Sequence, residues 1–475
     1  MASADEWSEE SASNSEAVNS SGEDLQARGT DERSEGCTSN SDASSSIMEE
    51  QPSLAACTFN LVLSSVGVGA LTMPWTTATL GWLQLSALLL VVFFVSVYNL
   101  FLMDSACRAR AVGKAWSSYG GIVAATLGSA GAYALEAFTL LYSFGLSVTY
   151  LGVVGDELSA LALKLVANWS PESEPAPRLL SPDMLMTIAV VCIVLPLSFM
   201  SEKWLRLTGA VGSACMFFTT LVIILSAPWR APPALFDACA GSSALGRPGL
   251  APVAWVSSLP ALLDAVPMLT FCLNASTAFV TIRAQLQPPG QKGQPTRGLV
   301  ASMIWGGQLL ALLDYVFVSA AGYLTFCGAV PDNILDAQPS SDLLALAARL
   351  ALAVQLCLAC AGVYVPLARA SLWRLLRGIH VDGKPFGAHR GTATALLLLV
   401  MLAAAVALGG LLELPLDFIS AVCTTAIMFV FPGLCSARLQ ASPSGKCGPL
   451  LFALSGLVVG SAATLTLIVQ VSDEH

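Results

Sequence analysis

Three carboxylates lie within long apolar runs of the sequence: Glu136, Asp264 and Asp314. An ionisable side chain at membrane depth costs at least about 2.5 kcal/mol on insertion scales, so such a group marks an ion or proton pathway by default. Desolvation disfavours the charged form of a carboxylate, which lets it take up and release a proton. We therefore treat all three as ion-coupling candidates. Asp314 lies closest to the middle of its run; the alternative for Asp264, in the outer half, and for Glu136, near a run's end, is contact with water.

The sequence lacks the residue patterns for metal-dependent hydrolysis, ATP-driven transport and intramembrane proteolysis. The chain has three His, none in an H-E-x-x-H pair, so metal-dependent hydrolysis has no ligand set. A phosphate-binding G-x-x-x-x-G-K-[ST] loop is missing, which excludes ATP-driven transport by this chain alone. Cys357 and Cys360 form one C-x-x-C inside an apolar run, where thiols pack as small hydrophobes. Asp264 and Asp314 lack the Tyr-Asp and Gly-x-Gly-Asp settings of intramembrane proteases. We expect no enzyme, no metal and no cofactor.

The charge is concentrated at the N-terminus. The chain has 475 residues, of which 55% are hydrophobic and 11% charged, and a net charge of −10. Residues 1–50 hold 13 Asp and Glu against Arg28 and Arg33, so the tail carries all the acidity. Such a Ser- and Glu-rich stretch cannot bury enough apolar surface to order itself. We predict a disordered acidic cytoplasmic tail over 1–50 and a membrane domain over 51–475; the acidity also argues against nucleic acid as a partner.

Apolar runs long enough to cross a bilayer, about 20 residues each, predict eleven membrane-spanning helices. Fifteen of the 22 Lys and Arg residues, Arg283 among them, then fall in loops on the side of the tail, and five, including Arg349, fall on the other side. By the positive-inside rule the N-terminus is cytoplasmic. We expect the Gly-rich stretch 120–131 to lead into the third span. The predicted spans are 54–80, 82–106, 131–154, 184–200, 207–227, 255–283, 299–326, 343–367, 392–412, 417–437 and 449–471.

Two of these spans contain helix breakers in their middle. The first, FNLVLSSVGVGALTMPW, contains Gly67, Gly69 and Pro74, and the sixth contains Pro267 followed by Asn274 and Ser276. Irregular backbone at membrane depth survives only where it is buried in protein or lines a cavity. Interrupted helices five spans apart indicate an inverted repeat with a midplane site, spans one to five and six to ten forming the halves. The alternative for the glycines is close helix packing.

Both halves of the membrane domain contain recognisable motifs. The first half carries FNLVLSSVGVGAL (59–71), SSYGGIVAATLGSAG (117–131), TYLGVVGDEL (149–158) and IVLPLSF (193–199). The second half carries AVPMLTF (265–271), GYLTF (322–326), VPLARASL (365–372) and DFISAVCTTAIMFVFPGL (417–434). With these motifs the sequence resembles the amino acid/auxin permease family, and within it the branch of sodium-coupled neutral amino acid transporters. The resemblance implies an all-α leucine-transporter-type fold with broken first and sixth helices, carrying amino acids by alternating access.

The first break suits the binding of an amino acid zwitterion. Where the helix restarts, the N–H groups of Val68, Gly69 and Ala70 would lack intrahelical acceptors and bind a carboxylate. Free carbonyls at 64–66 and 273–275 would hold the ammonium group. Phe271 and Asn274 are candidates for the wall of the side-chain pocket. The full set of predicted substrate-binding residues is Ser64, Ser65, Gly67, Val68, Gly69, Ala70, Phe271, Asn274 and Ser276.

The positions implied by the resemblance for sodium ligands do not carry oxygen side chains. The asparagine of sodium-coupled relatives aligns with Leu63, and their eighth-span threonine with Cys360 or Ala359. The Cys-His pair of their sixth span is Ala275-Ser276 here. Because sodium prefers oxygen ligands, proton-coupled or facilitative transport is favoured over sodium coupling.

The sequence therefore predicts a secondary transporter of amino acids, most consistent with neutral ones, in a plasma, vacuolar or endolysosomal membrane. The alternative is a membrane sensor that binds an amino acid and transports little. Asn168 begins a glycosylation sequon in a predicted outer loop. Cys239 and Cys327 lie in or near outer loops, and whether they pair is left open.

Overall fold

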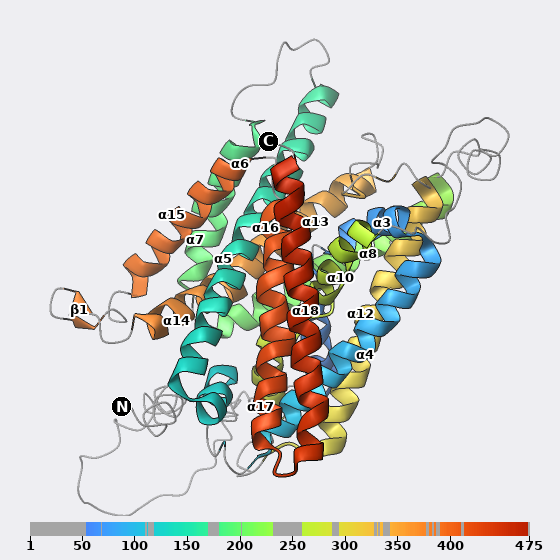
Figure 1. The fold of residues 1–475 in the computed structure, drawn as a ribbon. Coiled ribbons are helices and arrows are strands. Elements are labelled where there is room, and N and C mark those ends of the chain that lie inside the picture. Colours follow the sequence, from blue (N-terminus) through green and yellow to red (C-terminus); the bar gives the residue numbers. More distant parts are fainter. Residues whose placement is uncertain are drawn as a thin grey trace, which may run out of the picture.

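The chain is a bundle of helices (Figure 1). The computed structural model describes residues 54–67, 69–109, 118–169, 180–200, 202–230, 259–286, 294–326, 343–376, 390–409 and 413–473, together with 112, 330, 333–335, 380–381 and 384–385. The predicted acidic tail, Cys239 and Cys327 lie outside the described residues. A small antiparallel hairpin, β1 (His380–Val381) with β2 (Lys384–Pro385), pairs His380 with Pro385.

Eight helical stretches of the described chain are long and apolar enough to cross a membrane, and a bent pair of helices makes nine. Two shorter apolar helices, Pro182–Ser198 and Val211–Leu225, lie where the fourth and fifth spans are predicted. Each predicted span therefore coincides with a helix, and the count of eleven crossings remains a prediction. The long helices are α4 (Trp82–Cys107), α5 (Tyr119–Trp169), α12 (Arg297–Phe326), α13 (Leu343–Ala359), α15 (Arg390–Leu408) and α18 (Pro443–Asp473).

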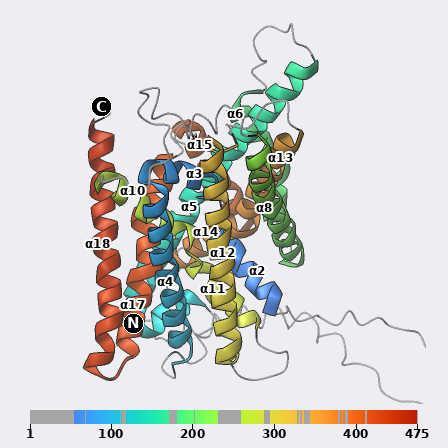
Figure 2. The same ribbon diagram turned by 90° about the vertical axis from the view of Figure 1, so that its right-hand side faces the viewer.

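The outer helices expose apolar side chains, as a lipid-facing surface requires. Leu451 and Leu465 on α18 and Leu396 on α15 are more than 60% exposed. A row of such residues would be unfavourable against water, because burying apolar surface stabilises by about 25 cal/mol per Å². Figure 2 shows α18 along one edge of the bundle, with α4 and α12 packed side by side.

Helix α5 changes direction at Gly128. Its backbone φ of 77° lies in the left-handed region, which glycine adopts at no steric cost. A Cβ at Gly128 would have nothing within 4 Å, so the backbone angle alone requires glycine here. The stretch predicted to lead into the third span is thus a helical turn set off by this kink.

Three spans contain a wide π-helical turn that ends just before a proline. These turns are η4 (Val190–Val194), η6 (Cys360–Tyr364) and η9 (Ala426–Val430), followed by Pro196, Pro366 and Pro432 in α7 (Leu195–Ser198), α14 (Val365–Leu375) and α17 (Phe431–Leu439). Proline clashes with the carbonyl four residues earlier and lacks an N–H, so it opens the ladder. In η9 the carbonyl five residues before Pro432, that of Ile427, accepts a hydrogen bond from Tyr119 Oη at 2.7 Å.

Candidate functional site

The first span breaks between α2 (Leu54–Ser65) and α3 (Gly69–Leu80), whose axes differ by 55°. Val66 N–H still closes the last turn of α2 on Val62 O, at 2.7 Å. Ala70 N–H donates to Gly67 O at 3.0 Å, so the prediction that this amide is free is wrong: a tight turn at the start of α3 uses it. Val68, at the centre of the break, lies outside the described residues.

The sixth span breaks between α10 (Leu259–Cys272) and α11 (Ser276–Gln285). Asn274 Oδ1 accepts from Ser276 N–H at 3.0 Å and so satisfies the first backbone N–H of α11. Asn99 of α4 donates to Ser276 Oγ at 2.8 Å, and Ser96 donates to Leu273 O at 2.7 Å. The carbonyl of Leu273, predicted to hold an ammonium group, is therefore already hydrogen-bonded within the protein.

The two breaks lie against each other. A Cβ at Gly69 would collide with Cys272 Sγ, at the end of α10, so only glycine allows α3 to approach this closely. Tyr315 of α12 links the same two segments: its Oη lies 2.7 Å from Ser65 O and 3.0 Å from Cys272 O. The prediction that the interrupted parts of the two spans meet is consistent with this packing.

Aromatic rings cover the break in the first span. Tyr150 Oη would lie 2.9 Å from a Cβ at Gly67, and the rings of Tyr150 and Tyr364 are 5.2 Å apart. Tyr142 lies 6.4 Å from Phe271 and 6.5 Å from Tyr364. Tyr364 ends the π turn η6, which turns its ring toward α5. These rings form an uncharged wall beside the break, which we call the aromatic wall (Tyr142, Tyr150, Phe271 and Tyr364).

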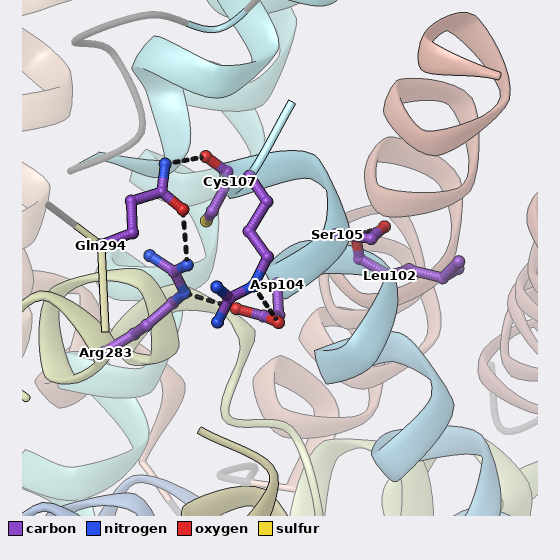
Figure 3. Close-up of polar contacts among 7 residues, drawn as sticks. Leu102, Asp104, Ser105, Cys107, Arg283 and Gln294 are labelled. Atoms are coloured by element: carbon purple, nitrogen blue, oxygen red, sulfur yellow. Dashed lines mark hydrogen bonds and ion pairs between the residues drawn. The ribbon is translucent and has the colours of Figure 1, made fainter. Parts of the chain in front are cut away.

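A charged network at one end of the bundle joins α4, α11 and the segment just before α12 (Figure 3). Asp104 accepts from Arg283 Nε at 2.6 Å and from Arg108 Nε at 2.8 Å. Arg283 also donates to Gln294, which donates to Cys107 O at 2.7 Å. Arg283 is fully buried, so its charge depends on Asp104 for compensation.

Within the described part of the chain, α5 also takes part in ion pairs with α14 and α13. Glu136 accepts from Arg374 of α14 at 2.7 Å. Toward the other end of α5, buried Glu157 accepts from Arg349 of α13 at 2.6 Å and from Asn333, while Arg349 also donates to Leu335 O. The segment 333–335 lies against α3, where Ile334 N–H donates to Leu71 O at 3.3 Å.

The whole membrane region matches a family described as "Transmembrane amino acid transporter protein", over residues 51–472. The chain belongs to the transmembrane amino acid transporter family. It is 26% identical to human "Solute carrier family 38 member 8" over 86% of this chain and 93% of that protein. It is 22% identical to the bovine "Putative sodium-coupled neutral amino acid transporter 11" over 82% of this chain and 77% of that protein.

Membership in the transmembrane amino acid transporter family makes the chain an integral, multi-pass membrane protein and a transporter rather than an enzyme. The predicted resemblance is therefore confirmed, and with it the amino acid as the class of substrate.

The three candidate carboxylates have different surroundings in this transporter. Glu136 is buried and paired with Arg374, so contact with water does not explain it. Asp314 is half-buried between α12 and α8 (Glu202–Arg230), where it is hydrogen-bonded to Thr220, while its Oδ2 has no partner within the described chain. The side chain of Asp264 lies outside the described residues.

The positions that align with sodium ligands of relatives differ in burial. Cys360, the first residue of η6, is fully buried and hydrogen-bonded to Ser147. Ala359 precedes it, and Leu63 lies in the second half of α2; both are half-buried. Ala275 and Ser276 are both fully buried at the break of the sixth span. Leu63, Ala359, Cys360 and Ala275 themselves supply no side-chain oxygen.

Sequence reasoning missed several residues of the site. Three tyrosines of the aromatic wall and Tyr315 were not singled out, although a hydroxyl inside an apolar run signals a buried partner. Arg283 and Arg349, counted as loop charges, are buried in α11 and α13. Their positions near the ends of apolar runs could not show that the helices continue and pair them with carboxylates.

Proposed function

We propose that this protein moves neutral amino acids across a membrane by alternating access. The proposed fold is the leucine-transporter type, with eleven spans, a 5+5 inverted repeat and a cytoplasmic N-terminus. The observation that supports it most is the contact of the two broken spans, where Gly69 faces the last turn of α10. Breaks of this kind supply unpaired peptide groups at the midplane, where transporters of this architecture bind substrate.

The start of α3 is the proposed carboxylate site. Amides of Val68 and Gly69 would bind the carboxylate at the positive end of the α3 dipole. The ammonium group would lie by the carbonyls of Ser64 and Val66, because those of Ser65 and Leu273 have partners. Ala70, Asn274 and Ser276 then shape the two breaks around the substrate.

The aromatic wall supports neutral substrates. Tyr142, Tyr150, Phe271 and Tyr364 present rings and hydroxyls, with no charge to pair with an acidic or basic substrate. An unpaired charge at membrane depth is costly, so this wall favours an apolar or small polar substrate side chain.

Proton-coupled or facilitative transport fits better than sodium coupling. Leu63, Ala359 and Cys360 offer no oxygen side chain. Among the carboxylates, Asp314 is the best proton carrier, since one of its oxygens is buried without a partner in the described chain. A proton on Glu136 would weaken its pair with Arg374. Asp264 remains a candidate on its position in the sequence.

Alternating access requires both ends to open in turn, and each end has a closure. The Asp104 network joins α4 to α11, and the Glu157–Arg349 pair holds α5, α13 and the segment 333–335 together. Phe271, Asn274 and Ser276 are buried, so substrate enters only after one closure opens.

Uptake of labelled neutral amino acids by the purified protein in proteoliposomes tests the proposal. Inward sodium and proton gradients are imposed separately. We expect uptake that is unchanged when choline replaces sodium, and a loss of any proton stimulation in Asp314→Asn. Saturable binding without flux in sealed vesicles would instead identify a sensor, and sodium-dependent uptake would overturn the proposed coupling.

A further inference from the structure

Tyr315 occupies the point where both chain breaks meet. Its hydroxyl lies 2.7 Å from the carbonyl of Ser65, the last residue of α2, and 3.0 Å from that of Cys272, the last residue of α10. The backbone of Gly67 lies beside the same oxygen. Tyr315 is fully buried. One side chain from a third helix therefore contacts the interrupted backbone of both broken spans.

Both carbonyls require a positively charged group or a hydrogen-bond donor beside them. Each ends a half-helix, where carbonyls lack intrahelical donors and carry the negative end of the helix dipole. Two such ends brought together in a protein interior repel each other and attract either a cation or a hydrogen-bond donor. Here the donor is the phenol, which is neutral, covalently attached and always present.

We propose that the Tyr315 hydroxyl takes the place of a bound cation between the carbonyls of Ser65 and Cys272. It holds the ends of α2 and α10 together and positions the restart of α3, so transport needs no metal ion at this point. Tyr315 is a positioning residue, because it contacts the backbone of both breaks rather than the substrate. The inference rests on the proposed function for its transport readout alone.

The side chain is better suited to this role than to simple packing. A phenylalanine would fill the same space in an apolar interior, yet would leave the buried carbonyls of Ser65 and Cys272 without the one O–H that they share. Leaving a buried polar group unpaired costs more than the hydrogen bond itself contributes. On the same face of α12, about two turns earlier, Gln308 Nε2 lies 3.4 Å from Ser65 Oγ, so a second polar contact fixes the same residue of α2.

Two variants and one control test the proposal. Tyr315→Phe removes only the hydroxyl, and Tyr315→Ser removes the ring and opens room beside the carbonyls of Ser65 and Cys272. Tyr98→Phe removes a hydroxyl from the exposed face of α4 and serves as control. Uptake is measured in sodium, lithium and choline media, and the melting temperature of each purified protein is measured against sodium concentration.

We expect Tyr315→Phe to lose transport roughly tenfold or more in every medium, with the Tyr98→Phe control unchanged. Tyr315→Ser should transport poorly in choline and regain uptake in sodium or lithium, because a small cation can then bridge the two carbonyls. Its melting temperature should rise with sodium more than that of the unaltered protein.

Wild-type uptake by Tyr315→Phe would overturn the proposal. A Tyr315→Ser protein whose melting temperature follows sodium no more than the unaltered protein would overturn it as well. The melting measurement needs no transport, so an unaltered protein that moves no amino acid would refute the proposed function and leave this test intact.

Discussion

The two breaks are stabilised in opposite ways. In the sixth span, polar side chains bond the break: Asn274 accepts from the first N–H of α11, and Ser96 and Asn99 of α4 donate to Leu273 O and Ser276 Oγ. In the first span, glycines surround the break, and its main side-chain partner is Tyr315 of α12. A break in a membrane helix can therefore be a structural joint, whose backbone groups are hydrogen-bonded within the protein, or an open break, whose peptide groups lack such partners. Only the open kind leaves peptide groups for a ligand.

The largest effect is expected at Gly69, where a substitution tests most directly whether the first break differs in function from the sixth. Gly69→Ala should abolish uptake, because its methyl group collides with Cys272 Sγ. The double variant Gly69→Ala with Cys272→Ala removes that collision. We expect it to fold and still to transport poorly, because the methyl group shields the carboxylate-binding amides. Cys272→Ala alone is the control, measured by uptake and melting temperature.

Full recovery of uptake in the double variant would show that Gly69 serves packing alone. That result would make the first break a structural joint like the second.

A smaller effect is expected at Asn274, in the sixth span. Asn274→Ala removes the hydrogen bond to the first N–H of α11 and should lower the free energy of unfolding by about 0.5–1.5 kcal/mol. The KM for the substrate should change less than in the Gly69 variants, because this hydrogen bond supports structure. Asn274→Ser, which keeps a side-chain oxygen at this position, is the matched control. A large rise in KM with unchanged stability would assign Asn274 to the substrate instead.

A loss of stability no larger than this is expected at Ser96, which also supports the break in the sixth span. Ser96→Ala leaves Leu273 O without its donor, and thermal unfolding should show a loss of about 0.5–1.5 kcal/mol. Ser86→Ala, on the same helix, removes an exposed hydroxyl that donates to Trp82 O one turn earlier, and should leave the free energy of unfolding unchanged. Equal effects of the two substitutions would contradict the assignment of Ser96 to the break.

The smallest effect is expected at Tyr150. Its hydroxyl lies 3.5 Å from that of Tyr364, at the limit of a hydrogen bond, so Tyr150→Phe should change stability by less than about 0.5 kcal/mol. The same substitution should make Gly67→Ala better tolerated, because it removes the atom that a Cβ at Gly67 would meet. Uptake by Gly67→Ala with and without Tyr150→Phe measures this.

The sequence predicted what is local and missed what is distant along the chain. The breaks can be predicted from Gly67, Gly69 and the Asn274 segment, because backbone conformation depends on neighbouring residue types. Tyr315 could not be predicted, since its partner Ser65 is 250 residues away. The sequence predicts a free amide at Ala70 because residue types alone do not show the four-residue turn that bonds it to Gly67 O.

Charged residues illustrate the same limit. Whether an arginine near the end of an apolar run lies in a loop or in a helix depends on a carboxylate elsewhere. Arg283 and Arg349 are buried because Asp104 and Glu157, 179 and 192 residues earlier, receive them.

In the Asp104–Arg283, Glu136–Arg374 and Glu157–Arg349 pairs, the acid comes from the first half of the chain and the arginine from the second. The consequence concerns biogenesis. At roughly 5–20 residues per second of synthesis, Asp104 waits about 10 to 40 s for Arg283 to emerge. During that interval Asp104 can pair with Arg108 of its own helix, but the arginines that Asp104, Glu136 and Glu157 take from the second half have not yet been made. The ion pairs between the halves therefore form only after the second half has been translated. Two separately expressed halves would have to meet within the bilayer to form these pairs.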